Sequence, residues 1–78
     1  MIGTIRMVLT WKRSVHEAAV WRLLKRAGIQ VLRGRFTGSD ASVDAVVQGT
    51  MGRARELVGR LESAGIRATA LESEPAIG

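Results

Sequence analysis

Cysteine is absent from the 78 residues, so the chain forms neither disulfides nor thiolate metal sites. Proline occurs once and tyrosine never. No apolar run approaches the ~18 residues of a membrane span, and we expect no membrane partner. The opening MIGTIRMVLTWKR lacks the basic leader and the cleavage site of a signal peptide, which makes a cytoplasmic location the default expectation.

A chain of 78 residues is long enough for one domain, which we place at residues 1–72, with a loose tail at 73–78. Folding buries only about 60–65% of the surface of so short a chain, and its stability is correspondingly marginal. Because disulfides and thiolate metal sites are excluded, any additional stability must come from oligomerisation or from very good packing.

Acidic residues are scarce in the first half. Residues 1–39 hold eight bases and one acid, a net charge of +7, whereas residues 40–78 hold four bases and six acids, a net charge of −2. Such asymmetry is typical of proteins with an anionic partner. Ten of the twelve bases are arginine, which a GC-rich genome also explains.

Two stretches repeat each other 37 positions apart. LLKRAGIQVL (23–32) and RLESAGIRATAL (60–71) align when Gly28 is laid on Gly65. Each has the pattern of a helix end, a glycine that stops the helix in the left-handed conformation, and the strand that follows.

Hydrophobic periodicity predicts six elements. Alternation predicts strands in TIRMVLTW, IQVLRGRF, SVDAVVQG and IRATALE. A first helix should begin after Ser14, a candidate N-cap with Glu17 as its capping-box partner. A second should begin after Thr50. The apolar face of the first helix is expected to be His16, Ala19, Val20, Leu23 and Ala27. That of the second is expected to be Ala54, Leu57, Leu61 and Ala64.

The order β-α-β-β-α-β predicts an α+β fold of the ferredoxin-like (split βαβ) type, a four-stranded antiparallel sheet with two helices on one face. The other face should be polar if it meets water. Yet Val8 lies opposite Ile5, Met7 and Leu9 in the first strand. In the second strand, Leu32 and Phe36 lie opposite Ile29 and Val31. This surplus predicts a homodimer that buries it, by a second layer or by edge-to-edge pairing.

The stretch LLKRAGIQVL resembles the ACT domain family, whose pattern there is Leu-Ala-x-x-Gly-Ile-Asn-Ile. Residues 24–31 match it, LESAGIRATAL matches the family's closing Leu-x-x-x-Gly-Phe-x-Val, and the resemblance covers about residues 4–72. The related NIL domain, found on methionine transporter ATPases and some ferredoxins, shares the layout, but its Asn-Ile-Leu is replaced here by IQVLRG. The resemblance implies a regulatory module that binds an amino acid or related effector between copies.

The family's ligand loop, Asp-Arg-Pro-Gly, corresponds here to Lys12, Arg13, Ser14 and Val15, of which only Arg13 matches. The resemblance and the cationic loop before a helix N-terminus together predict a small anionic effector. The expected ligand-binding residues are Trp11, Lys12, Arg13, Ser14, Val15, Gly28, Ile29, Gln30 and Val31. For Ser14, the alternative is a cap alone, with the cations solvated.

A second interpretation is a small basic nucleic-acid-binding protein. Its footprint would be Trp21, Arg22, Lys25, Arg26, Arg33 and Arg35, with Trp21 either exposed as a contact or leaning across a helix edge. RGRF (33–36) invites comparison with RNA-recognition motifs, but the third predicted strand carries no aromatic residue to stack bases.

Catalysis and metal binding find little support. His16 is the single histidine, and neither Ser14 nor Glu17 is placed to work with it as nucleophile or orienting acid. One histidine with scattered carboxylates makes a poor metal site. We therefore predict a protein that is not an enzyme, with no catalytic residue, no metal and no cofactor.

Overall fold

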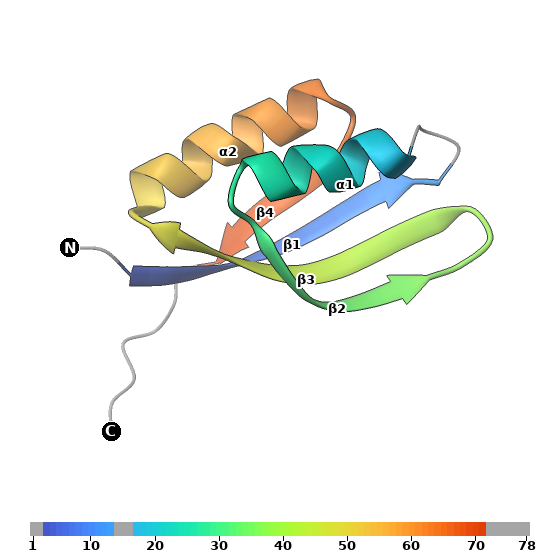
Figure 1. Ribbon diagram of the computed structural model, residues 1–78, viewed down its shortest axis with the longest axis horizontal. Helices are drawn as coiled ribbons and strands as arrows, with labels where there is room; N and C mark the ends of the chain where they lie inside the picture. Colours follow the sequence, from blue (N-terminus) through green and yellow to red (C-terminus); the bar gives the residue numbers. More distant parts are fainter. Residues whose placement is uncertain (1–2, 14–16, 72–78) are drawn as a thin grey trace.

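The computed structural model describes residues 3–13 and 17–71, and these follow the order β-α-β-β-α-β. The strands are β1 (Gly3–Lys12), β2 (Gln30–Phe36), β3 (Asp40–Gly49) and β4 (Arg67–Leu71). The helices are α1 (Glu17–Arg26) and α2 (Met51–Ser63). All neighbouring strands are antiparallel in the order β2-β3-β1-β4, and both helices lie on one side of the sheet (Figure 1). The predicted ferredoxin-like α+β fold is confirmed.

The core lies between the sheet and the helices. Alternate residues of the two central strands point into it, and all of them are buried: Ile5, Met7, Leu9 and Trp11 from β1, and Ala41, Val43, Ala45 and Val47 from β3. Val20 and Leu24 of α1 and Ala54, Leu57 and Leu61 of α2 cover them. No polar side chain is buried among the described residues.

The repeated sequence blocks form the same turn twice. The backbone N–H of Ile29 donates to Leu24 O at 3.0 Å, and that of Ile66 donates to Leu61 O at 2.9 Å. Gly28 and Gly65 sit at φ 73° and 87°, in the left-handed region that favours glycine. This is the Schellman arrangement, in which the residue after the glycine packs on the last turn of the helix. It explains why Leu, Gly and Ile recur at the same spacing.

The helix α2 begins directly after Thr50, as the sequence predicts. Thr50 has an extended backbone, and its Oγ1 accepts from the N–H of Arg53 at 3.2 Å. The predicted cap at Ser14, the histidine His16 and the tail at 73–78 all lie outside the described residues.

The predicted face of α1 is partly wrong. Leu24 is buried and Ala19 is exposed, while Leu23 and Ala27 are half-buried. The helix is rotated about its axis toward β2, which brings Trp21 against Trp11 and Phe36. Packing of the large indole outweighs burial of one alanine methyl group. In α2 the predicted Ala64 is likewise exposed, because the helix ends there.

The simple alternation expected for β2 is also wrong. Val31 pairs with Ala45 but Arg33 pairs with Asp44, so Leu32 is an extra residue at a β-bulge. The bulge reverses the faces of everything after it. Phe36 therefore lies on the helix side, and Arg33 and Arg35 take the open face. Gly34 lies beneath Phe36, where a Cβ atom would stand 2.7 Å from Cε2 of the ring.

Candidate functional site

One row of residues crosses the sheet on the face that the helices leave open. The strand register places four residues side by side in it: Arg35, Ser42, Thr10 and Arg67. The next row toward the end of the sheet holds Lys12 opposite Asp40. The row thus brings arginines from the two edge strands toward hydroxyls on the two central strands.

A hollow of about 600 Å³ opens at this end of the sheet, and we call it the cationic hollow. Its charged lining is Lys12, Arg35, Arg67 and Asp40. Its hydroxyls come from Thr10, Thr37 and Ser42, and Trp11, Ala41 and Gly65 complete the walls. Three cations, one carboxylate and three hydroxyls form a lining suited to carboxylate or phosphate oxygens.

The cations of the hollow are not neutralised within residues 3–13 and 17–71. The ion pair found there joins Arg13 to Glu17, and none involves Lys12, Arg35 or Arg67. Asp40 accepts from Ser39 Oγ at 3.2 Å and does not reach Lys12 within ion-pair distance. Like charges held together repel, and a bound anion would relieve that repulsion.

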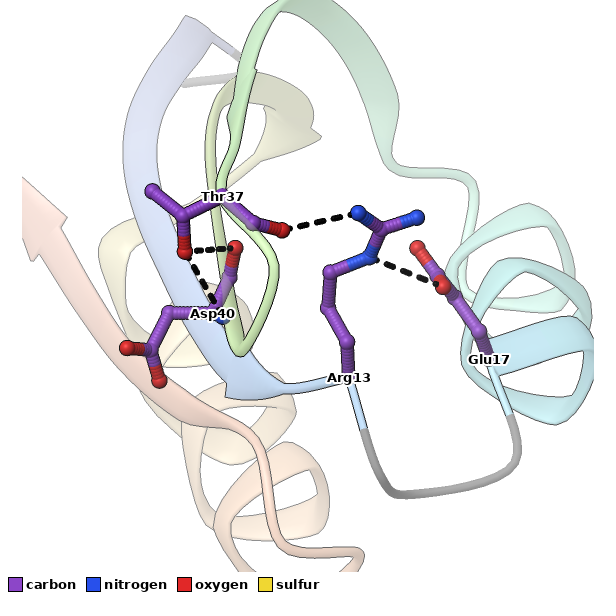
Figure 2. A network of polar contacts seen from close by, with 4 residues as sticks. All are labelled: Arg13, Glu17, Thr37 and Asp40. Carbon is purple, nitrogen blue, oxygen red and sulfur yellow. Dashed lines mark hydrogen bonds and ion pairs between the residues drawn. The ribbon is translucent and has the colours of Figure 1, made fainter.

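Beside the hollow, Arg13 links the β2–β3 turn to Glu17 at the start of α1 (Figure 2). Its Nη1 donates to Thr37 O at 2.8 Å, and its Nε donates to Glu17 Oε2 at 3.4 Å. Its guanidinium carbon lies 5.6 Å from the centre of the Phe36 ring. The backbone N–H of Arg13 also donates to Ser39 O at 2.9 Å. Arg13 is therefore engaged in holding the turn.

The turn itself is tightly hydrogen bonded, as Figure 2 shows in part. Thr37 Oγ1 accepts from the backbone N–H of Asp40 at 2.9 Å and donates to Asp40 O at 3.1 Å. The backbone N–H of Thr37 donates to the same carbonyl at 2.9 Å. Since Thr37 and Asp40 both line the cationic hollow, these bonds and the Arg13 clasp fix one of its walls.

The rings of Trp11, Trp21 and Phe36 form an aromatic cluster on the helix side of the sheet. The rings of Trp11 and Trp21 meet edge to face at 5.5 Å, and Trp21 and Phe36 lie 6.3 Å apart. Trp21 is half-buried in this contact, so it leans across the helix edge and is not freely exposed. Trp11 is buried, and its Nε1 has no hydrogen-bond partner among the described residues.

The expected ligand-binding residues fall into two groups. Trp11 and Lys12 line the hollow and Arg13 lies beside it, bonded to Thr37. The other group, Gly28, Ile29, Gln30 and Val31, lies at the opposite end of α1. Val31 pairs with Ala45 and Trp11 pairs with Ala41, a separation of four residues along β3 or ~13 Å. One copy therefore does not bring the groups together. Ser14 and Val15 lie outside the described residues.

The expected nucleic-acid footprint is divided between the two sides of the molecule. Arg22, Lys25 and Arg26 are exposed on α1. Arg33 and Arg35 lie on the open face of the sheet, on the far side from α1, because of the bulge in β2.

Sequence reasoning missed Arg67, Thr10, Ser42 and Thr37 as members of the site. Their places follow from the strand order, which puts β1 between β3 and β4 and so aligns Arg67 with Thr10. A register drawn for the predicted ferredoxin-like sheet is the signal that would have found them.

No protein-family model matches this chain, and a search of curated proteins finds no match either. The described residues hold no group of three or more histidine or carboxylate side chains placed to bind a metal ion. Neither α1 nor α2 has the length and apolar composition to cross a membrane.

Proposed function

We propose that the chain is an ACT-like regulatory module that binds a small anionic effector in the cationic hollow. The observation that carries this proposal is the convergence of Lys12, Arg35 and Arg67, from three different strands, on one hollow of about 600 Å³. In this proposal, Arg13 acts as a positioning residue that holds the turn 37–40 beside the ligand.

The lining favours a particular effector chemistry. Three cations against one carboxylate leave an excess of two positive charges, which suits two carboxylates or one phosphate group. Asp40 adds an acceptor for an ammonium group, and the hydroxyls of Thr10 and Ser42 add neutral hydrogen-bonding partners. An acidic amino acid carries all the matching groups. We therefore place acidic amino acids first among the candidate effectors.

The proposal includes a dimer through the edge strand β2. Leu32 and Phe36, 55% and 48% exposed, are two of the three large apolar side chains exposed in the described part, and both lie on this edge. Antiparallel pairing of two β2 strands about Arg33 would place residues 30–31 of one copy beside residues 35–36 of the other. Residues 30–31 of one copy would then lie beside Arg35, which lines the cationic hollow of the other copy, with β3 between them and β1.

Nucleic-acid binding remains the second candidate because the open face carries more cations than the hollow alone. Arg6 and Arg33 extend it, against Asp44 as a further acid. The rings of Trp11, Trp21 and Phe36 all lie on the helix side, so bases have no aromatic platform on this face. Such binding would rest on phosphate contacts and would weaken steeply with salt.

A thermal-shift screen at physiological salt tests the proposal. The panel is the twenty amino acids, small dicarboxylates, inorganic phosphate, phosphorylated metabolites and one short single-stranded DNA. A ligand at about 100 times its dissociation constant adds ~2.7 kcal/mol to the free energy of unfolding. For a chain of this size we expect the melting temperature to rise by about 11–22 °C, since each kcal/mol is worth ~4–8 °C.

The variants Arg35→Gln and Arg67→Gln should abolish most of that rise. Arg6→Gln is the matched control, because it removes the same charge from the same face four residues along β1 from Thr10, a distance of ~13 Å. An equal loss with Arg6→Gln would indicate general electrostatics. A rise with DNA alone would favour the second candidate.

A further inference from the structure

A second recess lies between the two helices, on the other side of the sheet from the row that contains Arg35 and Arg67. Figure 1 shows α1 and α2 side by side above the sheet. Between them run two adjoining hollows of about 430 and 230 Å³, which share Leu23 and Arg26. We call the two together the interhelical groove.

The floor of the interhelical groove is apolar and its rim is cationic. Val20 and Leu23 of α1, Leu57 and Leu61 of α2, and Ile66 supply aliphatic surface. The charged side chains that line it are Arg22, Arg26 and Arg60, and no carboxylate lines either hollow. None of these arginines takes part in an ion pair within the described residues. Glu56, one helical turn before Arg60, forms no such pair either.

Size and charge together select one kind of occupant. The groove follows α1, whose ten residues span ~15 Å, and its two hollows are too small to embed a helix of ~10–12 Å diameter. A single alkyl chain fits that length and that volume. The surrounding guanidinium groups complement a carboxylate at the end of such a chain, which they can bind through two parallel hydrogen bonds.

We propose that the interhelical groove binds a medium-chain fatty acid. The alkyl chain lies over Leu23, Leu61 and Ile66, which together line both hollows, and the carboxylate lies at Arg26. Burial of each methylene group favours binding by ~0.8 kcal/mol, so affinity rises steeply with chain length. This site shares none of its lining residues with the cationic hollow.

Isothermal titration calorimetry with dodecanoate, kept below its micelle concentration, tests the proposal on the full chain. We expect saturable binding of one dodecanoate per chain and at least a hundredfold weaker binding of hexanoate, because six methylene groups are lost. Dodecyltrimethylammonium, with the same chain and the opposite charge, should bind much more weakly than dodecanoate.

The arginines that line the groove are exposed, so their replacement by glutamine should leave the fold intact. Arg26→Gln should weaken dodecanoate binding roughly three- to fivefold, as expected for one partly solvated ion pair. The combined Arg22→Gln, Arg26→Gln and Arg60→Gln variant should abolish saturable binding. Arg55→Gln, on the side of α2 away from the groove, is the matched control and should change nothing.

Three outcomes would overturn the proposal. They are no saturable binding of dodecanoate, equal binding of dodecyltrimethylammonium, and equal weakening by Arg26→Gln and Arg55→Gln. Binding of an acidic amphipathic peptide without binding of dodecanoate would also overturn it and assign the groove to a protein partner.

Discussion

Phe36 and Gly34 form the contact whose energy is most directly testable. A Cβ atom at residue 34 would lie 2.7 Å from Cε2 and 2.9 Å from Cζ of Phe36, and 3.4 Å from Cγ1 of Val43. The last distance is ordinary contact, so only the ring must move. Gly34→Ala should therefore swing the Phe36 ring away from Trp21 and Arg13.

The cost follows from the contacts that the ring would lose. The aromatic pair with Trp21 contributes ~0.5–1.5 kcal/mol and the cation–π contact with Arg13 ~0.5–1 kcal/mol. Alanine in place of glycine stabilises a strand by ~0.5–1 kcal/mol, because glycine loses more backbone freedom on folding. Gly34→Ala should thus lower the free energy of unfolding by ~0–2 kcal/mol when Phe36 is present. It should stabilise by ~0.5–1 kcal/mol in a Phe36→Ala background.

A double-mutant cycle by urea unfolding measures the difference between the two backgrounds, which we expect to be ~1–2.5 kcal/mol. Tryptophan fluorescence reports the same event directly, because Trp21 loses its neighbour. The same stabilisation by Gly34→Ala in both backgrounds would refute the placement of Phe36 over Gly34, and with it the phase of β2 after the bulge.

The remaining predictions concern the elements that support the site. Gly28→Ala, at φ 73°, should destabilise the protein by ~1 kcal/mol. Gly59 is exposed in α2 with nothing within 4 Å of its Cβ position, so Gly59→Ala should stabilise the protein by about as much. Thermal unfolding checks both signs. Leu24→Ala, at a residue only 1% exposed, should cost ~2–5 kcal/mol and leave much of the chain unfolded by circular dichroism. Arg13→Ala should raise amide hydrogen exchange at Thr37 and Asp40 while changing global stability by less than ~1.5 kcal/mol, and equal exchange in both proteins would contradict the clasp.

Sequence reasoning recovered the fold because its signals were local and repeated. The Leu-x-x-x-Gly-Ile spacing forms both helix ends, and the alternation in β1 and β3 selects their buried faces. Thr50 caps α2 as its side chain and position predict.

The errors arose where one residue changes the phase of an element. The extra residue Leu32 reverses the faces of the residues that follow it, and the cue to a bulge in IQVLRGRF is the interior glycine, Gly34, which does not fix the position of the bulge. The contact of Trp21 with Trp11 and Phe36 rotates α1 away from its expected face.

The candidate site was only partly predictable for a related reason. Trp11, Lys12 and Arg13 are contiguous and were singled out from sequence. Arg67 and Arg35 join Lys12 only through the pairing of strands far apart in the chain. Gly28 to Val31, singled out by the resemblance, belong to the other end of α1 in a single copy.

The most direct test of anion binding in the cationic hollow is a nitrogen–proton NMR titration with L-aspartate, and separately with inorganic phosphate, at an ionic strength of about 0.15 M. We predict saturable shifts for at least one of the two, confined to the amides that line the hollow, in residues 10–12, 35–42 and 65–67. Neither ligand giving saturable shifts, or shifts spread evenly over the arginines of both faces, would contradict the proposed function.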